Sequence, residues 1–172
     1  MNERVYVARS LDDFPAEWGQ VVRHPSGQPL FHSDILNYWD GIASFTIPGE
    51  SALGWFELTR RPFSGSEVEC HRRTPEALLC IHGSAVCLAG APVPESQLRP
   101  DNLQAFHLEA GQGIVFAPGT WHAIPFPVSE QAAFWVLFQK GTEKSDMSIF
   151  NLAEGLGMTF RVELAVPTGA GQ

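Results

Sequence analysis

Polar and apolar residues alternate between positions 66 and 73, where the sequence reads SEVECHRR. Glu67, Glu69 and His71 are spaced by two, with Val68 and Cys70 between them. Successive side chains of a strand point to opposite faces, so this pattern predicts a strand with three polar side chains on one face. Two carboxylates and an imidazole are therefore expected side by side.

Further short strands are predicted along most of the chain. The runs ALLCIH and AVCLAG flank a Gly83-Ser84 turn, which indicates a hairpin over residues 77–90. The other strands are expected as two within residues 44–62 around Pro48-Gly49, one in 103–111, two around a tight turn in 113–126, and the apolar run 132–139. At least six short strands indicate an all-β sandwich or barrel.

The N-terminal part adds one helix. Leu11, Phe14 and Trp18 recur at near-helical spacing, and Asp12 and Asp13 are expected to cap a short helix. Residues 23–30, RHPSGQPL, predict a loop because their prolines and glycine do not fit regular structure.

An aromatic stretch follows that loop. Its bulky residues are Phe31, His32, Tyr38 and Trp39. They are compatible with a barrel mouth or with a subunit contact, and the sequence does not separate the two.

Composition narrows the class of protein. A chain of 172 residues with 44% hydrophobic residues can bury one core, so a single domain spanning 1–172 is expected. The net charge of −8 argues against nucleic acid as a partner. No apolar run approaches the roughly 20 residues that span a bilayer, and the N-terminus lacks the apolar core of a signal peptide. We therefore expect no membrane partner and a cytoplasmic location.

The three cysteines, Cys70, Cys80 and Cys87, do not suggest a disulfide framework. Their number is odd, and their spacing lacks the paired C-x-x-C of zinc sites. Reduced, partly buried thiols are expected.

The spacing of Glu69, His71, Glu76 and Gly83, followed by the segment GQGIVFAPGTWH that ends at His122, resembles the two motifs of the cupin jelly roll. In that family, two histidines and a glutamate from the first motif and one histidine from the second meet on a divalent metal inside the barrel. The resemblance implies a jelly-roll fold with a few short peripheral helices and places Glu69 where the first histidine usually stands. Residues 1–62 would complete the barrel, 63–165 would form its core, and 166–172 would be a frayed tail.

The residue types agree with a metal site. Two carboxylates and two imidazoles suit a borderline or hard divalent ion such as nickel, manganese, zinc or iron, and no organic cofactor is expected. Strands supply the rigid ligands that an open metal site requires. The alternative is that His71 and His122 are ordinary polar groups and that Glu69 and Glu76 face solvent.

A closer resemblance extends over most of the chain. The segments FPAEWGQVV, LFHSDILNYWD, EVECHRRTPEALLCIHG, LQAFHLEAGQGIVFAPGTWHAIP and VLFQKGTEKSDMSI are similar, in this order, to segments of the ureidoglycolate lyase family. This resemblance implies a lyase, usually a homodimer, that releases urea and glyoxylate from (S)-ureidoglycolate in allantoin and purine breakdown. Its substrate would be a small ureido acid.

The chain also departs from that family. Cys70-His71-Arg72-Arg73 stands where an arginine-histidine-proline run is expected, and Glu76 replaces a frequent glutamine. The turn Pro118-Gly119-Thr120 resembles generic cupins. The last two differences bring the chain closer to metal-binding cupins.

Candidate roles follow for several other residues. Glu67 is the candidate general base because it faces the same way as Glu69 and His71, with a merely solvated carboxylate at the end of the strand as the alternative. Lys140 and His107, and more weakly His82, are candidates for acid catalysis or carboxylate contact, although a solvated lysine and structural histidines are the ordinary alternatives. Trp121 is expected in the cavity wall, with core packing as its alternative.

Other functions remain open. The same site would suit a metal-dependent oxygenase or isomerase with another substrate, or a non-catalytic cupin that binds a small acid or sugar. The clustering of carboxylates beside the histidines favours an enzyme over a binding module.

Overall fold

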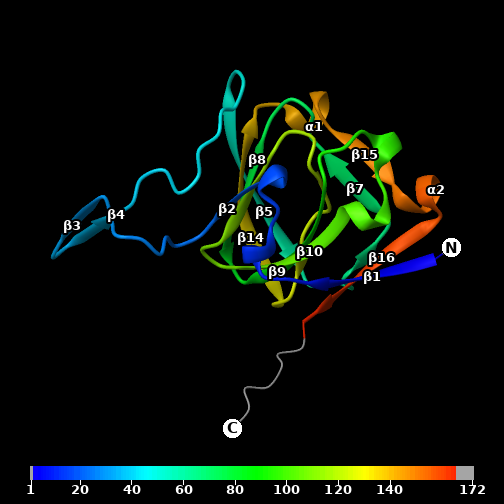
Figure 1. Ribbon diagram of the computed structural model, residues 1–172, viewed down its shortest axis with the longest axis horizontal. Helices are drawn as coiled ribbons and strands as arrows, with labels where there is room; N and C mark the ends of the chain where they lie inside the picture. Colours follow the sequence, from blue (N-terminus) through cyan, green and yellow to red (C-terminus); the bar gives the residue numbers. More distant parts are fainter. Residues whose placement is uncertain (1, 166–172) are drawn as a thin grey trace, which may run out of the picture.

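The computed structural model describes residues 2–165, whose regular structure is predominantly β (Figure 1). Its central layer is a six-stranded sheet of order β10-β9-β12-β7-β15, with β13 also paired to β9. The strands are β7 (Glu67–Cys70), β9 (Ser84–Gly90), β10 (Leu103–Glu109), β12 (Trp121–His122), β13 (Phe126–Pro127) and β15 (Ser148–Asn151).

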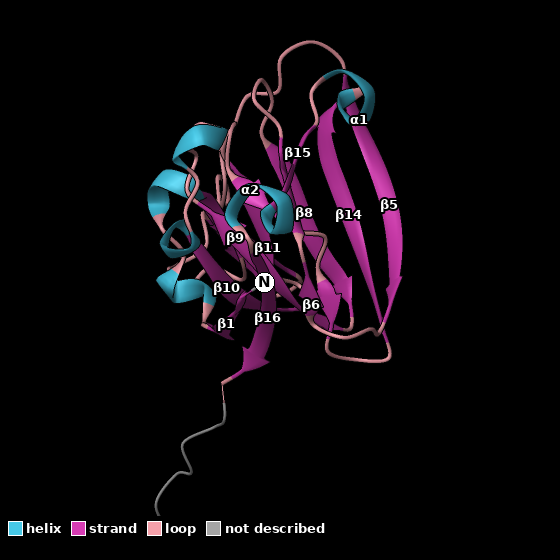
Figure 2. Cartoon of the chain, turned by 90° about the vertical axis from the view of Figure 1, so that its right-hand side faces the viewer, coloured by secondary structure: helices cyan, strands magenta, loops and turns pink. Residues whose placement is uncertain are grey.

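A five-stranded sheet of order β2-β11-β8-β14-β5 faces the central layer. It contains β2 (Gly19–Val22), β5 (Ser51–Thr59), β8 (Glu76–His82), β11 (Gly113–Phe116) and β14 (Gln131–Gln139). Figure 2 shows β14 and β5 as the long pair at one side of the molecule. Apolar side chains of the two sheets, including Leu78, Phe106 and Phe134, form the core between them.

A three-stranded sheet of order β1-β16-β6 covers the opposite face of the central layer. It consists of β1 (Asn2–Ala8), β6 (Ser64–Gly65) and β16 (Met158–Leu164). A second core, which includes Val68, Trp121 and Phe160, fills the space between these two sheets. The central sheet is therefore buried on both faces.

The chain alternates between the two large sheets. Strands β7, β9, β12 and β15 belong to the six-stranded sheet, whereas β8, β11 and β14 belong to the five-stranded sheet. This winding produces a jelly roll, and the predicted all-β cupin jelly roll is confirmed. Strands β2 and β5 complete the five-stranded sheet, but β1 lies in the outer layer.

The predicted hairpin over residues 77–90 is wrong. Strand β8 pairs with β11 and β14, whereas β9 pairs with β10, β12 and β13. Gly83 turns the chain from one sheet into the other at a φ of 73°. A Cβ there would lie 2.3 Å from the carbonyl oxygen of Gln131, so the turn requires glycine.

The predicted N-terminal helix is replaced by two 3-10 turns, Leu11–Asp13 and Ala16–Trp18. Pro15 precedes the second turn, and Ser10, not an aspartate, caps the first. The extended backbone at Phe14 and Pro15 separates the two turns. Leu11, Phe14 and Trp18 are nevertheless buried, so the spacing identified core residues correctly.

Two strands are predicted within residues 44–62, but only β5 forms there. The chain from 44 to 50 is irregular and β5 ends at Thr59. The stretch before it forms a small separate hairpin of β3 (Phe31–Ser33) and β4 (Leu36–Tyr38). The short helices are α1 (Thr142–Ser145) and α2 (Leu152–Leu156), and further 3-10 turns span Glu95–Gln97 and Pro100–Asn102. The tail predicted at 166–172 lies outside the described residues.

Residues 2–165 contain no helix with both the length and the apolar character that crossing a membrane requires.

Candidate metal centre and active-site cavity

Four polar side chains meet inside the jelly roll. Glu69 lies on β7, His71 directly follows that strand, Glu76 begins β8, and His122 ends β12. His122 is the cross-strand partner of Glu69, which explains how a residue so distant in sequence reaches the first three. His71, Glu76 and His122 are buried, and Glu69 is half-buried.

The side-chain atoms of this cluster lie close together. Glu76 Oε2 is 2.9 Å from His71 Nε2 and 3.2 Å from His122 Nε2. Glu69 Oε1 is 3.6 Å from His122 Nε2. Potential ligand atoms of Glu69, His71 and His122 all lie within 4.8 Å of one another.

Backbone carbonyls orient both imidazoles. His71 Nδ1 lies 2.8 Å from the carbonyl oxygen of Asp146, and His122 Nδ1 lies 3.1 Å from that of Thr120. A carbonyl oxygen only accepts hydrogen bonds, so each Nδ1 must carry a proton and donate it. This arrangement directs both Nε2 atoms toward the carboxylates, as in metal sites whose histidines are held by backbone carbonyls.

The geometry of the cluster fits a metal ion. Despite their short separation, Glu76 Oε2 and His122 Nε2 are fully buried and have no hydrogen-bond partner among the described residues. Two ligand atoms each about 2.1 Å from one ion are about 3.0–3.4 Å apart at tetrahedral or octahedral angles. The observed separations are close to this range, and carboxylate and imidazole are ligands that divalent ions share.

Without a metal, the buried carboxylate needs a proton on a histidine. Burial alone would lower the pKa of His122, but Glu76 and Glu69 outweigh it and raise the pKa to about 10. Burial would raise the pKa of Glu76, yet the imidazoles of His122 and His71 lower it to about 2. The site therefore retains a positive charge beside Glu76, and either a proton or a cation can supply it.

Asp146 supports the cluster from behind His71. Its Oδ1 accepts a hydrogen bond from the backbone N–H of Arg72 at 3.0 Å, and its Oδ2 accepts one from that of Arg73 at 2.8 Å. Its own carbonyl oxygen accepts the bond from His71 described above. Asp146 therefore fixes both the turn after His71 and the ring of His71.

His122 is supported by an aromatic ring. Phe116 stacks on the imidazole with ring centroids 4.5 Å apart and an angle of 6° between the planes. This stacking restricts rotation of the His122 ring.

The cluster lies in a cavity of about 300 Å³. The walls are mainly apolar and include Phe56, Leu58, Val136 and Phe138. Apart from the four clustered residues, the only charged lining residue among those described is Glu143. Such a cavity can enclose a small polar molecule and keep most water from it.

A wider cavity of about 540 Å³ adjoins the first. The two share Glu69, His122, Ile124 and Met147 as lining residues. Arg61 is the only lysine or arginine that lines either cavity within residues 2–165. Arg61 therefore adds one positive charge to the cavity that Glu69 and His122 also line.

Arg61 is held in a defined position. Its Nη2 donates to the carbonyl oxygen of Ile124 at 3.1 Å, and its guanidinium lies 4.3 Å from the centroid of the Phe126 ring. Partial burial lowers the pKa of Arg61, and no carboxylate of the described residues forms a salt bridge with it.

The structure brings one further predicted residue to this region. Glu67 lines the wider cavity together with Glu69 and His122, and its side chain is exposed. Its position two residues before Glu69 on β7 agrees with the shared face predicted from the alternation.

Three other predicted site residues lie elsewhere. Lys140 is exposed and paired with Glu50 at 3.0 Å, because β14 carries it past the end of the cavity. His107 lines a separate surface groove beside Arg9 and Ser84. Trp121 is fully buried and donates its indole N–H to the carbonyl oxygen of Val93 at 3.0 Å, because side chains alternate along β12 and His122 takes the cavity side. His82, the weaker candidate, is exposed at the end of β8 and is absent from both cavity walls.

Sequence reasoning missed Asp146 and Arg61. Asp146 lies 75 positions from His71, in a segment that resembles the family, but no spacing in that segment connects it with the ligand residues. Arg61 belongs to the pair Arg60-Arg61 in an irregular connection, where surface charge is the ordinary expectation. An alternation test would not have found either residue, because neither lies in a strand.

A jelly roll with two imidazoles and two carboxylates converging in its barrel defines a cupin with a candidate metal centre. The chain belongs to the ureidoglycolate lyase family, whose sequence model matches residues 45–159. It is 25% identical over 146 residues to the ureidoglycolate lyase of Chelativorans sp. (strain BNC1), a match that covers 81% of this chain and 86% of that relative. The predicted family is confirmed, and the chain is assigned to a family of lyases.

Two solved structures of low sequence identity are also similar to this chain. A mutant 3,4-ketoisomerase from Thermoanaerobacterium thermosaccharolyticum, in complex with TDP-4-keto-6-deoxyglucose, has a TM-score of 0.49 and 15% identity, covering 74% of this chain and 84% of that chain. Oxalate decarboxylase from Bacillus subtilis has a TM-score of 0.41 and 20% identity, covering 62% and 24%.

Proposed function

We propose that this protein cleaves ureidoglycolate into urea and glyoxylate with the help of a divalent metal ion. The observation that carries the proposal is the buried cluster of Glu69, His71, Glu76 and His122 in a chain of the ureidoglycolate lyase family. The reaction needs a site that binds a small anion and moves one proton, and both requirements match groups in the two cavities.

The proton balance of the reaction is simple. The central carbon of ureidoglycolate carries a hydroxyl, a carboxylate and the ureido nitrogen. When the hydroxyl loses its proton, its oxygen forms a carbonyl bond to the carbon, and the bond from carbon to nitrogen breaks. The departing nitrogen takes up one proton, so urea and glyoxylate form without a net exchange of protons or electrons.

The metal would be held by His71 Nε2, His122 Nε2 and the carboxylates of Glu69 and Glu76. When bound, a divalent ion acts as a Lewis acid that makes the substrate hydroxyl easier to deprotonate. Nickel, manganese, zinc and iron all accept this mixed donor set, so the ligands leave the identity of the metal open.

Glu67 is proposed as the general base. It lines the wider cavity at the point where the cavity meets Glu69 and His122, and its exposure keeps it free to approach a bound molecule. The proton that Glu67 accepts from the hydroxyl can then be delivered to the ureido nitrogen. One carboxylate would thus perform both transfers, in place of a separate acid such as Lys140.

Arg61 is proposed to bind the substrate carboxylate. Three carboxylates, Glu69, Glu76 and Glu143, line the inner cavity and would repel an anion in the absence of a cation. Arg61 offers a positioned guanidinium in the adjoining cavity, and its fork of donors matches a carboxylate. A substrate held there would extend its hydroxyl toward the metal ligands.

The remaining parts of the proposal rest on the family. We assign the (S) enantiomer, a role in allantoin and purine breakdown, a homodimer and a cytoplasmic location as predictions. The three buried free thiols, Cys70, Cys80 and Cys87, agree with a reducing compartment.

The proposal is tested by incubating the pure protein with each enantiomer of ureidoglycolate and measuring urea, glyoxylate and ammonia. Equal amounts of urea and glyoxylate from one enantiomer, without ammonia, are expected. Glu76→Gln should lose this turnover while circular dichroism remains unchanged. Release of ammonia would instead identify a hydrolase, and no product from either enantiomer would refute the assignment.

A further inference from the structure

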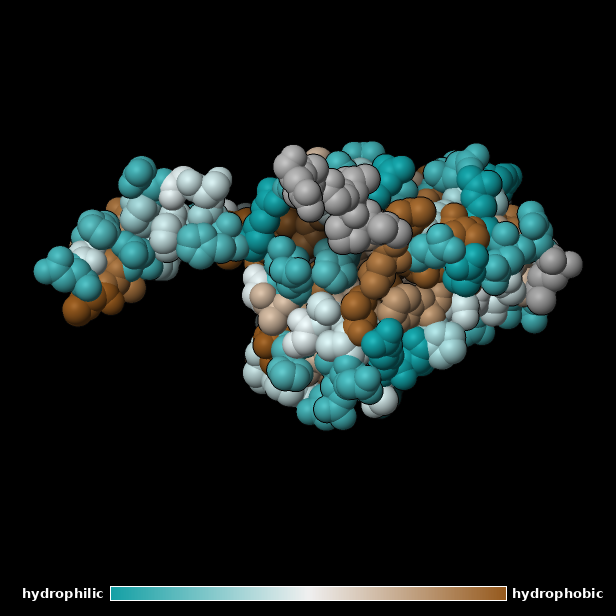
Figure 3. Space-filling view, turned by 90° about the horizontal axis from the view of Figure 1, so that it is seen from below, coloured by the Kyte–Doolittle hydropathy of each residue, from teal (hydrophilic) through white to brown (hydrophobic). Residues whose placement is uncertain are grey.

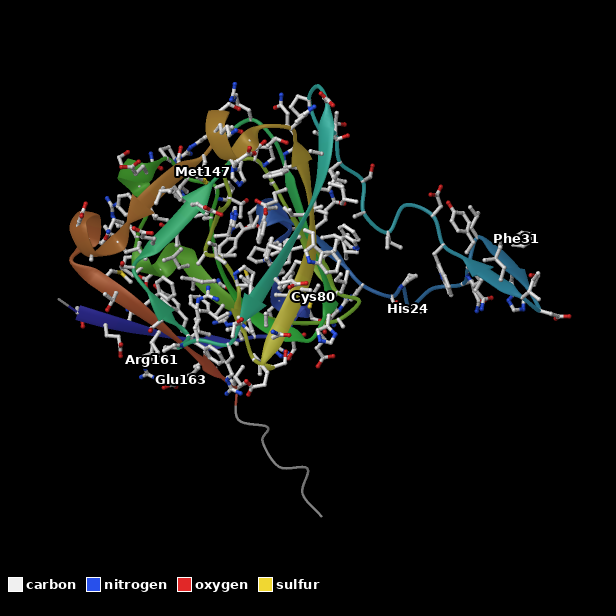
Figure 4. The ribbon with its side chains drawn as sticks, turned by 180° about the vertical axis from the view of Figure 1, so that it is seen from behind. His24, Phe31, Cys80, Met147, Arg161 and Glu163 are labelled. Atoms are coloured by element: carbon white, nitrogen blue, oxygen red, sulfur yellow. The ribbon has the colours of Figure 1, made fainter. Side chains whose placement is uncertain are left out.

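One segment of the described residues stands away from the body of the molecule, to which an ion pair of Arg23 with Asp12 ties its start. Residues 23–43, called the arm below, project from the jelly roll and carry the β3–β4 hairpin at their far end (Figure 1). Figure 4 shows the same separation from behind, with His24 near the start of the arm and Phe31 near its tip. Strands β3 and β4 pair only with each other.

The arm is rich in exposed apolar side chains, which Figure 3 shows as a brown group at its tip. Ile35 is 96% exposed and Leu30 is 72% exposed. The others are Phe31, Leu36, Tyr38 and Ile42. Contiguous apolar surface of this kind usually marks a contact with another molecule.

The arm nevertheless has a defined shape. Trp39 donates its indole N–H to the carbonyl oxygen of Gly27 at 2.8 Å and packs edge-on against His24. At its base, the side chain of Gln20 makes two hydrogen bonds with the backbone of Ser44, at 2.7 and 3.0 Å. An isolated two-stranded hairpin is at best marginally stable in water, so a partner surface would stabilise the tip.

The outer face of the five-stranded sheet is also apolar and open. Leu53 and Trp55 on β5 and Trp135 on β14 are 61%, 49% and 37% exposed, and Ile81 on β8 adjoins them at 36%. The three-stranded sheet covers the outer face of the six-stranded sheet. Within residues 2–165, no sheet covers the outer face of the five-stranded sheet. The Trp55 and Trp135 rings, on the neighbouring strands β5 and β14, pack edge to face with their centroids 4.8 Å apart.

The arm and this face belong to one surface. The arm leaves the sheet after β2 at one edge, and the chain re-enters it at β5, the opposite edge. Figure 1 shows the arm projecting from the side of the molecule where the strands of this sheet lie. The arm and the outer sheet face together form an apolar surface on which a globular partner could pack.

We propose that a second copy of this chain occupies this surface, with the arm of each copy packed on the outer sheet face of the other. Each copy carries both complementary parts, so a two-fold pairing covers both arms and both faces at once. The hydrogen bonds of Gln20 with Ser44 hold the base of the arm, which favours an exchanged arm over one folded back on its own sheet. The family resemblance implies a dimer without naming its surface, and this proposal supplies that surface.

The test uses two variants that each add one exposed cysteine to the full chain, Ile35→Cys in the arm and Leu53→Cys on the sheet face. The native cysteines are buried, so a short bismaleimide should react at the introduced positions. Mixing the two variants should give a covalent pair that contains one chain of each kind, identified by mass spectrometry. Links only between two Ile35→Cys chains, only between two Leu53→Cys chains, or no links at all would overturn the proposal.

A charge variant gives a second measurement. Ile35→Asp lies at a fully accessible position, so it should leave folding intact but raise the dimer dissociation constant at least about tenfold by sedimentation. Val7→Asp, at a 51% exposed position on β1, is the matched control and should remain at twice the 18.9 kDa chain mass. A monomeric wild type, or an Ile35→Asp dimer as tight as the control, would contradict the arm exchange.

Discussion

His71 and Asp146 are coupled through two parts of one aspartate. The backbone carbonyl of Asp146 accepts a hydrogen bond from His71 Nδ1 at 2.8 Å, while its carboxylate accepts hydrogen bonds from the backbone N–H groups of the two residues that follow His71. The ring and the adjoining turn are thus fixed by a residue that comes from the segment between α1 and β15. Metal affinity should depend on this positioning residue although its side chain does not point at the ligand atoms.

Asp146→Ala should weaken metal binding about 10- to 100-fold, as is typical when support behind a ligand is removed. The substitution leaves two backbone N–H groups without their acceptor, so the free energy of unfolding should fall by about 1–3 kcal/mol. Asp146→Asn retains one acceptor oxygen, so its metal affinity and its stability should fall less than those of Asp146→Ala. Competition with a fluorescent chelator measures the affinity, and equal affinity in all three proteins would rule out the role.

The stability of the metal-free protein should be greatest between the ordinary pKa values of glutamate and histidine. The pKa of His122 is raised from 6.5 to about 10, so its contribution is complete below pH 6.5 and declines as the pH rises toward 10. The pKa of Glu76 is lowered from 4.5 to about 2, so its contribution is complete above pH 4.5 and declines as the pH falls toward 2.

Calorimetry of the chelated protein should therefore show a lower Tm at about pH 9 than at about pH 5.5. Metal-loaded protein should show a smaller alkaline decline, since the cation replaces the proton beside Glu76. His122→Ala removes the titrating group, so an unchanged alkaline decline in this variant would assign the effect to other residues.

Arg61→Met should raise the KM for ureidoglycolate about 10- to 100-fold, because a charge-assisted hydrogen bond to the carboxylate is worth about 1.5–3 kcal/mol. The value of kcat should change much less. Arg60→Met is a matched control, since Arg60 is the exposed neighbour and lines neither cavity. Equal KM values for the two variants would remove Arg61 from substrate binding.

Glu67→Gln should lower kcat about 100- to 10,000-fold, the range expected for loss of a general base. Metal content should stay unchanged, because Glu67 is not among the ligand residues. Glu109→Gln, an exposed position on β10, should retain full activity. A variant with normal kcat would indicate that another group or solvent accepts the proton.

The residues of the cluster could be found in the sequence because their order is local and periodic. The spacing of two predicts Glu69 and His71 on the same side of the chain, and the structure has Glu69 on β7 with His71 directly after it and Glu76 at the start of β8. His122 joined them only through the family motif, since its pairing with Glu69 depends on the fold. The same alternation did not distinguish Trp121 from His122, and only the structure shows which of the two faces the cavity.

The prediction of a hairpin over residues 77–90 is wrong for a different reason. A turn with glycine between two apolar strands predicts that the strands pair with each other, but Gly83 sends β8 and β9 into opposite sheets. Which partner each strand takes is decided by distant segments, such as β11 for β8 and β10 for β9. Asp146 and Arg61 were missed for the same reason, because their contacts join segments far apart along the chain.

The central claim is that a metal held by the buried cluster drives cleavage of ureidoglycolate. The most direct measurement is glyoxylate release by chelated protein during titration with nickel, manganese, zinc or iron(II), with bound metal counted on the same samples. We predict negligible turnover after chelation and a linear recovery that ends at one metal ion per chain, with no recovery in Glu76→Gln. Full turnover by protein shown to be metal-free would contradict the account.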